Sequence, residues 1–237
     1  MLTLWKGHEA CQSKGQTGNK EMERDKRIKT AAVVCNGEID DLAWLKGELA
    51  GHDAVIAADG GSRHLNAAGV KPDCILGDGD SLPPDYDMSI ERIVFPADKD
   101  ATDTELAVEY AMDHEHSTIV LYGALGARPD HSFCNIMLLA KYCGRLVIKE
   151  RRAAVYCVPA GDALSLMGKP GDIVSLQPVG AGSCCSTKGL LYALDSEILE
   201  PGSRGVSNSL TAPDARISVE SGKIIVFHII DEGKEKK

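Results

Sequence analysis

The side chains with the clearest chemical potential in this sequence are carboxylates. Six aspartates stand at or shortly after the ends of stretches that read as buried strands: Asp59, Asp78, Asp80, Asp98, Asp100 and Asp103. Ligands of an open parallel sheet bind outside the carboxyl ends of its strands, so these groups are expected to converge. Converging carboxylates repel one another and resist ionisation unless a cation neutralises them. A bound Mg²⁺, which takes carboxylate and phosphate oxygens, would remove that conflict.

The first acidic segment, Gly77-Asp-Gly-Asp-Ser81, has a plain structural alternative as a polar turn. It does not fit a calcium-binding EF-hand. With Asp78 as the first loop position, Pro83 stands where the sharp-turn glycine belongs and Ser89 where the bidentate Glu belongs. A metal site of another kind and a simple turn both remain open for this segment.

The second acidic segment, Asp98-Lys-Asp-Ala-Thr-Asp-Thr-Glu105, could equally be the start of a helix. Asp100 or Thr102 would then cap the helix, and acids in its first turn would be favoured by the helix dipole. Capping does not explain why Asp98 and Asp100 precede the cap and flank Lys99. Lys99 is a cation that could contact a phosphate.

The third segment is a glycine-rich loop, Gly123-Ala-Leu-Gly-Ala-Arg-Pro-Asp-His131. Its glycines let the backbone approach a ligand, and Arg128 offers a planar fork suited to phosphate oxygens, unless Arg128 only pairs with Asp130. The sequence contains neither the phosphate loop of P-loop enzymes nor a dinucleotide-binding fingerprint after a strand. Phosphate would therefore be held by carboxylate-bound Mg²⁺, Lys99, Arg128 and backbone amides near Gly60-Gly61.

The elements that must position these groups alternate between strand and helix up to about residue 158. Short apolar runs predict strands over 31–35, 54–59, 73–77, 93–95, 118–122 and 146–148. Helical periodicity predicts helices over 40–50, 61–69, 103–114 and 130–143. Such alternation indicates an α/β fold, a mainly parallel sheet with helices on both faces.

The remainder of the chain loses the helical period. Apolar runs separated by glycine and proline turns predict strands over 162–167, 172–176, 190–194, 216–219 and 223–230. These strands indicate a small antiparallel β-sandwich. The predicted organisation is a polar N-terminal extension (1–29), an α/β catalytic domain (30–158), a β-sandwich domain (159–231) and a charged tail (232–237).

Composition narrows the function to small-molecule chemistry. The chain has 237 residues, 25.3 kDa and a formal net charge of −9, which disfavours a surface that binds nucleic acid by neutralising phosphates. It has no apolar run of the roughly 18–20 residues that a membrane helix needs, and no secretory signal, so a cytoplasmic location is expected. Its eight cysteines are expected to be reduced thiols, and the pair Cys184-Cys185 receives no role.

With these motifs in order, the chain resembles thiamine pyrophosphokinases of the bacterial type. In the first half the resemblance rests on Ala58-Asp-Gly-Gly61, Pro72-Asp-Cys-Ile-Leu-Gly-Asp-Gly-Asp-Ser81, Asp98-Lys-Asp-Ala-Thr-Asp-Thr-Glu-Leu-Ala107 and Gly126-Ala-Arg-Pro-Asp-His131 with Asn135. In the second half it rests on Lys188-Gly-Leu-Leu-Tyr192 and Gly205-Val-Ser-Asn208. The sequence departs from the family pattern at Gly79, where a bulky residue is usual, and at Ala127, where a glycine is common.

The resemblance implies transfer of a diphosphate from ATP to the hydroxyl of thiamine, giving thiamine diphosphate and AMP with Mg²⁺. It also implies a homodimer whose active site is shared between chains. By motif, the metal and catalytic candidates are Asp78, Asp80, Asp100 and Asp103, with Arg128 as a further catalytic candidate. The ATP-binding candidates are Asp59, Gly60, Gly61, Lys99, Thr102, Arg128, Asp130, His131 and Asn135. Ser207 and Asn208 are the thiamine-binding candidates.

Two alternatives stay open at this point. A haloacid-dehalogenase-like phosphatase would use Asp78 and Asp80 as nucleophile and acid, although that motif normally follows the first strand rather than the third. The other alternative is a relative that binds thiamine or a nucleotide without catalysis. Formation of AMP that requires thiamine would separate the proposed transferase from both.

Overall fold

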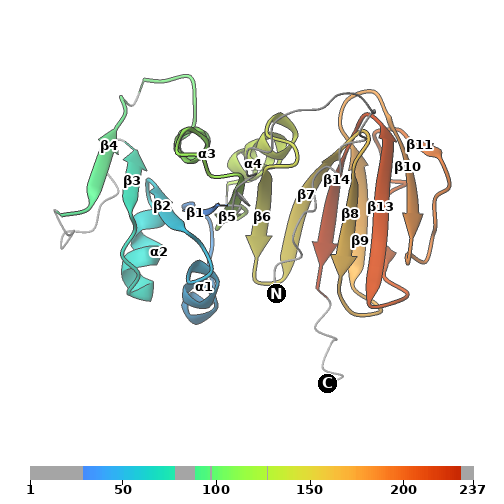
Figure 1. Cartoon of the computed structure of the whole chain (residues 1–237), viewed down its shortest axis with the longest axis horizontal. Coiled ribbons are helices and arrows are strands. Elements are labelled where there is room, and N and C mark those ends of the chain that lie inside the picture. The colour runs from blue at the N-terminus through green and yellow to red at the C-terminus, as the bar shows by residue number, and fades with distance from the viewer. Residues whose placement is uncertain (1–28, 78–88, 97, 127, 231–237) are drawn as a thin grey trace, which may run out of the picture.

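Two β-sheets organise the chain in the computed structural model, which describes residues 29–77, 89–96, 98–126 and 128–230 (Figure 1). Within these residues the larger sheet has ten strands in the order β12-β9-β14-β7-β6-β5-β1-β2-β3-β4, and the smaller has four in the order β11-β10-β13-β8. The mainly parallel sheet and the antiparallel β structure expected from the sequence are both present.

The first half of the chain forms the parallel part of the larger sheet. Its strands are β1 (Thr30–Val34), β2 (Ala54–Ala58), β3 (Cys74–Gly77), β4 (Glu91–Val94), β5 (Thr118–Tyr122) and β6 (Leu146–Glu150). The helices between them are α1 (Leu42–Leu49), α2 (Gly61–Ala68), α3 (Asp103–Asp113) and α4 (Pro129–Lys141). Each strand pairs in parallel with its neighbours from β4 to β6. The buried aliphatic runs of β1, β2, β3 and β5 favour this arrangement, whereas β4 at the edge is mostly exposed.

The helices pack in two pairs against different residues of the same strands (Figure 1). Ala31 and Val33 of β1 belong to a buried cluster with residues of α3 and α4, whereas Ala32 and Val34 belong to a cluster with residues of α1 and α2. Successive side chains of a strand point to opposite faces of the sheet. The two helix pairs therefore lie over opposite faces, and β1 is buried between them.

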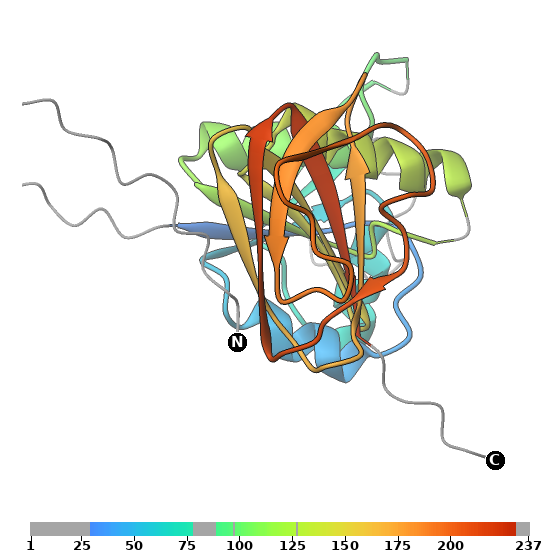
Figure 2. The ribbon, with the colours of Figure 1, turned by 90° about the vertical axis from the view of Figure 1, so that its right-hand side faces the viewer.

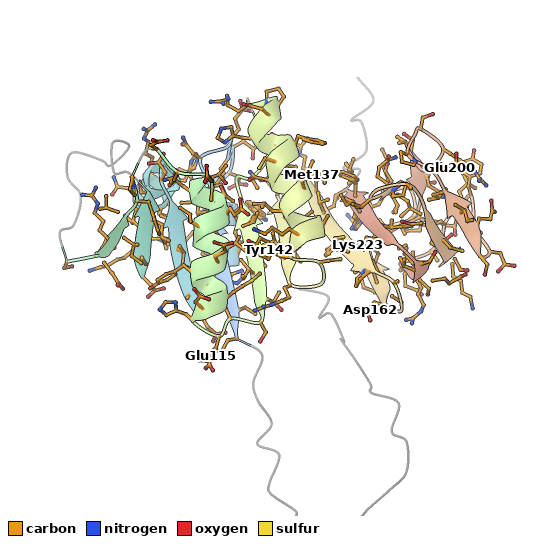
Figure 3. All side chains as sticks on the ribbon, turned by 90° about the horizontal axis from the view of Figure 1, so that it is seen from above. Glu115, Met137, Tyr142, Asp162, Glu200 and Lys223 are labelled. Carbon is orange, nitrogen blue, oxygen red and sulfur yellow. The ribbon has the colours of Figure 1, made fainter. Side chains whose placement is uncertain are left out.

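Side chains from two helices join α3 to α4, which lie side by side when the molecule is seen from above (Figure 3). Lys141 of α4 donates to Glu105 at 2.5 Å and to Glu109 at 3.4 Å, both on α3. The hydroxyl of Tyr142, labelled in Figure 3, also donates to Glu109 at 2.7 Å. These bonds hold the two helices that begin at the candidate site in one orientation.

The larger sheet continues without a break into the second half of the chain, where Figure 2 shows the two sheets facing each other. Strand β6 pairs antiparallel with β7 (Ala153–Pro159), followed by β14 (Lys223–Ile229), β9 (Ile173–Pro178) and β12 (Asn208–Ser209). The smaller sheet contains β8 (Ala163–Met167), β10 (Ser183–Lys188), β11 (Glu197–Leu199) and β13 (Asp214–Ser221). Aliphatic residues of both sheets fill the space between them.

One predicted strand of this region is wrong. Of residues 190–194 only Leu190 makes a sheet-like bridge, to Leu210, and the side chains of Leu191 and Tyr192 are 58% and 67% exposed. The real strand is β10, which was not predicted because it has small polar residues and few aliphatic ones. Its burial alternates all the same, with Ser183, Cys185 and Thr187 inside.

Two further sequence-based expectations can be compared with the described residues. No helix among them is long and apolar enough to cross a membrane. The seven cysteines that lie within the described ranges are free thiols in this structure.

Candidate active site

A cleft of about 670 Å³ opens at the carboxyl ends of β1, β2 and β5. It is lined by residues of four segments, 35–40, 58–64, 102–104 and 124–135. Strand β1 lies between β2 and β5, so the chain order of the sheet reverses at this point. Open α/β sheets bind their ligands where the strand order reverses. The cleft thus lies at the edge of the sheet to which the sequence assigned the acidic segments.

Asp59 is one of the two predicted metal or phosphate residues at the acidic side of the cleft. It follows β2 directly and has a φ of 45°, in the left-handed region that few non-glycine residues adopt. Its N–H donates to the carbonyl oxygen of Leu76 at 2.7 Å, which fixes this strained residue against β3. Strained conformations of this kind cluster at functional sites, where the surrounding structure imposes them.

Asp103 is the other of these two predicted residues and stands in the first turn of α3. Lys99 donates to its Oδ1 at 2.6 Å, and the ammonium group also lies 5.7 Å from the centre of the Phe95 ring. The side chains of Lys99 and Asp103 are only 17% and 26% exposed. Thr102 accepts from the Glu105 N–H at 3.2 Å, so of the two caps that the sequence allowed, Thr102 is the real one.

Not every predicted carboxylate that the structure describes lines this cleft. Asp98 and Asp100 are exposed and do not line it. Asp78 and Asp80 lie outside the described residues. In the described part of the chain no group of three or more carboxylate, imidazole or thiol side chains is arranged to hold a metal ion.

Arg128, the predicted cationic residue of the cleft, stands at the start of α4. Its guanidinium donates two parallel hydrogen bonds to Asp130, at 3.0 and 2.7 Å, as one of the sequence interpretations allowed. The guanidinium holds the pKa of the Asp130 carboxyl well below its usual range. Both side chains are exposed, so water screens the pair, and a phosphate could replace the carboxylate at Arg128.

Two predicted ATP-binding residues of α4, His131 and Asn135, line the cleft. Asn135 is buried, and its Nδ2 donates to the carbonyl oxygen of Ala124 at 2.7 Å, which ties the glycine-rich loop to the helix. The N–H of Gly126 donates to the hydroxyl oxygen of Ser132 at 3.1 Å. Side chains of α4 therefore fix the conformation of the glycine-rich loop, a role that the sequence did not indicate.

Gly60 and Gly61 begin α2 and do not contribute to the cleft lining, although Asp59 beside them does. Both are buried. A Cβ at Gly60 would lie 2.3 Å from the side chain of Asn36, a residue that lines the cleft. The absence of side chains at these positions lets the chain turn against the end of β1.

The predicted thiamine-binding residues lie in the β-sandwich and do not line this cleft within one chain. Ser207 is exposed with a φ of 62°, and its N–H donates to the hydroxyl of Ser175 at 3.0 Å. Asn208 is buried, and its side chain bonds both backbone groups of Tyr192, at 3.0 and 2.7 Å. Asn208 thus holds the neighbouring loop in place.

Several residues of the cleft were missed by sequence reasoning. Asn36, Glu38 and Asp40 follow β1, so the rule applied to the aspartates would have found them. Arg63 and His64 come from α2, and the ring of His64 hydrogen-bonds the carbonyl oxygen of Gly37 at 2.8 Å. Cys35 also lines the cleft, but burial raises the pKa of its thiol to about 12, which leaves no thiolate for nucleophilic catalysis.

Known protein families match the chain in two consecutive parts. The thiamin pyrophosphokinase catalytic domain matches residues 45–149, and the thiamin pyrophosphokinase vitamin B1 binding domain matches residues 164–224. A thiamine pyrophosphokinase of Bacillus subtilis (strain 168) is 34% identical over 119 residues, 48% of this chain and 56% of that protein. Thiamine pyrophosphokinase 1 of Oryza sativa subsp. japonica is 27% identical over 171 residues, 65% of each chain. These alignments span less than two thirds of either relative.

Solved structures of the same kind share the fold. A thiamin pyrophosphokinase from Geobacillus thermodenitrificans is 28% identical, with a TM-score of 0.74 over 86% of this chain and 99% of that one. A thiamine pyrophosphokinase from Bacillus subtilis has a TM-score of 0.76 at 23% identity, over 86% of this chain and 100% of that one. None of these comparisons supports a haloacid-dehalogenase-like phosphatase or a non-catalytic relative.

Proposed function

Because the chain belongs to the thiamine pyrophosphokinase family, we propose that it transfers the terminal diphosphate of ATP to the hydroxyl of thiamine, giving thiamine diphosphate and AMP. The observation that supports this most directly is the cleft itself. Its lining includes the predicted carboxylates Asp59 and Asp103 and the predicted guanidinium of Arg128, at the point where the strand order of a parallel sheet reverses. This set suits a substrate that carries both phosphates and a metal ion.

The proposed reaction needs positioning and charge neutralisation rather than a covalent intermediate. The hydroxyl oxygen of thiamine attacks the β-phosphorus in line, the bond to the bridging oxygen of the α-phosphate breaks, and the hydroxyl proton is released. Arg128 would bind the phosphate oxygens and neutralise the charge that develops on them. Lys99 would hold Asp103 in place, through the 2.6 Å bond between them. Asp100 is one candidate to accept the proton.

The oxygen donors of the cleft fit a hard cation such as Mg²⁺. This ion usually binds one or two carboxylates and completes its coordination with water and substrate phosphates. Asp59 and Asp103 are the described residues that would hold it, with Asp78, Asp80 and Asp100 as the other candidates. When bound, Mg²⁺ neutralises the phosphate oxygens of ATP during transfer.

The proposal includes a homodimer in the cytoplasm, with thiamine bound between two chains. Ser207 and Asn208 lie in the β-sandwich and do not line the cleft of their own chain. A second chain could bring its sandwich to this cleft, so that Ser207 meets the thiamine pyrimidine. This arrangement explains why neither predicted thiamine-binding residue lines the cleft of the chain to which it belongs.

An assay of AMP formation tests the reaction. With ATP, Mg²⁺ and thiamine, the purified protein should release one AMP for each thiamine diphosphate formed. Without thiamine or without Mg²⁺ it should release none. Release of orthophosphate from ATP alone would instead identify a phosphatase, and no turnover under any condition would contradict the proposed activity.

Ser207→Ala should raise the KM for thiamine about tenfold and lower kcat less, the loss expected for one hydrogen bond to a substrate. Ser207 is preferred to Asn208 for this test because only the Asn208 side chain supports the loop at Tyr192. The melting temperature should stay within about 1 °C of the parent's, as for most exposed substitutions. An unchanged thiamine KM would remove Ser207 from the binding site.

A further inference from the structure

Glu150, the last residue of β6, reaches across to the glycine-rich loop that follows β5. Its Oε1 accepts from the N–H of Ala124 at 2.9 Å and from the N–H of Leu125 at 3.2 Å. The N–H of Gly123 also stabilises the ionised form of this carboxylate. Two successive amides thus bind one carboxylate oxygen, as they would bind an anion.

These bonds use backbone groups of the loop whose glycines were expected to let the backbone approach a ligand. The amides of Ala124 and Leu125 point to Glu150, and the amide of Gly126 points to Ser132. All three loop residues line the cleft. The N–H groups of Ala124, Leu125 and Gly126 are thus bonded within the protein, and Glu150 accepts two of these bonds.

We propose that Glu150 is a positioning residue of the nucleotide site, whose ionised carboxylate holds residues 123–126 in the form that accepts ATP and whose protonation loosens them. The expected effect on the KM for ATP rests on the proposed function. The expected effect of Glu150 on the conformation of residues 123–126 is independent of that function.

The surroundings of Glu150 make its charge sensitive to pH. Burial, with a smaller contribution from Asp40 in the segment after β1, raises the pKa of its carboxyl to about 7. The Nε of Arg151, the next residue along the chain, lies 3.9 Å from the Oδ1 of Asp40 and attracts that carboxylate. The Cys35 thiol, at the end of β1, also faces Glu150, and the carboxylate contributes to raising the pKa of that thiol. Glu150 therefore changes charge near neutral pH.

The sign of this shift separates a positioning role from a purely structural one. A carboxyl whose pKa is about 7 in the folded state, against an ordinary 4.5, binds more protons folded than unfolded between these values. Stability therefore falls as pH rises from 4.5 to 7, and the ionised Glu150 destabilises the fold at pH 8. A neutral substitute should be more stable at pH 8, which is unexpected for a residue that serves only stability.

The experiment compares Glu150→Gln with a matched control, Glu48→Gln. Glu48 is also a half-buried carboxylate near β6, but it accepts from Lys149 at 2.5 Å and does not contact the loop. Glu150→Gln should raise the melting temperature at pH 8 by about 3 °C or more and by less at pH 5.5. Glu48→Gln should lower the melting temperature because it breaks an ion pair.

Kinetics and amide exchange then separate the outcomes. At pH 8, Glu150→Gln should raise the KM for ATP about tenfold with the thiamine KM unchanged, since a neutral acceptor binds the amides less strongly. The increase of kcat/KM for ATP between pH 6 and 8 should disappear in this variant, while Glu48→Gln keeps the parent's KM and pH profile. A parent-like KM and pH profile in Glu150→Gln would overturn the inference.

Hydrogen exchange of the Ala124 and Leu125 amides tests the loop even if the protein forms no AMP. At pH 8 these amides should exchange about tenfold faster in Glu150→Gln than in the parent, because a weaker acceptor protects them less. Equal protection in both proteins would overturn the inference by itself. Absence of AMP formation with faster exchange would contradict the proposed activity and leave the role of Glu150 supported.

Discussion

Asp103→Asn should lower kcat for diphosphate transfer about 100-fold or more, the usual cost of removing one group that stabilises developing charge. Asp103 lines the cleft and is held by Lys99 at 2.6 Å, with little exposure of either side chain. The amide keeps the size of the carboxylate but loses its charge. It can neither hold a hard cation well nor orient the ammonium group of Lys99. Steady-state assays of AMP formation at saturating ATP and thiamine measure this effect.

Asp113→Asn is the matched control, because Asp113 is exposed at the other end of the same helix. It should leave kcat within about twofold, as for most surface substitutions. Asp103→Asn should itself remain folded, since the Thr102 cap is retained and the loss of an acid from the first turn costs only about 0.3–1 kcal/mol. A kcat near the parent's value in Asp103→Asn would exclude Asp103 from the reaction.

Lys99→Ala, combined with Asp103→Asn, tests whether the two residues act as a pair. Residues in direct contact have effects that do not add. If Lys99 acts by holding Asp103, the double variant should be no slower than Asp103→Asn alone. If the two substitutions lower kcat by independent factors that multiply, Lys99 instead contacts the phosphates directly.

Local patterns were sufficient to predict the parallel half of the fold and the edge where the cleft lies. The strands around β1 are short apolar runs and the helices between them have a clear period, so neighbouring residues already encode these elements. The positions of Asp59 and Asp103 then follow from topology, because each stands where a strand or a following helix meets one edge of the sheet. Strand order alone does not decide which residues share the pocket, since Asp98 and Asp100, predicted by the same rule, are exposed outside it.

Features that depend on distant partners could not be read from the sequence. Strand β10 is polar, and it is a strand because β13 and β11 pair with its two edges. Leu190 and Leu191 are as apolar as strand residues, yet Gly189, with a φ of 78°, turns the chain just before them. Glu150 is one acid among many in the sequence. Its role is evident only in the folded structure, where β6 pairs with β5 and the carboxylate accepts hydrogen bonds from the loop.

Gly61→Ala should destabilise the protein by about 3 kcal/mol or more, or prevent folding, as severe overpacking does. Gly61 is the first residue of α2 and is buried against β1. A Cβ at this position would lie 1.9 Å from the carbonyl oxygen of Val34 and 3.2 Å from the N–H nitrogen of Cys35. Both atoms belong to the backbone at the end of β1, so no side chain can rotate away to relieve the clash. Denaturant unfolding of the purified variant measures the loss.

Gly47→Ala is the opposite case and serves as the control. Gly47 is an exposed residue inside α1, and an added Cβ would meet no atom within 4 Å. Alanine favours the helix over glycine, so this variant should gain up to about 1 kcal/mol of stability. The two substitutions add the same methyl group and differ only in what it meets. If Gly61→Ala were as stable as the parent, α2 could not lie this close to β1, and Asp59, which stands between β2 and α2 in the chain, would lose the position on which the cleft depends.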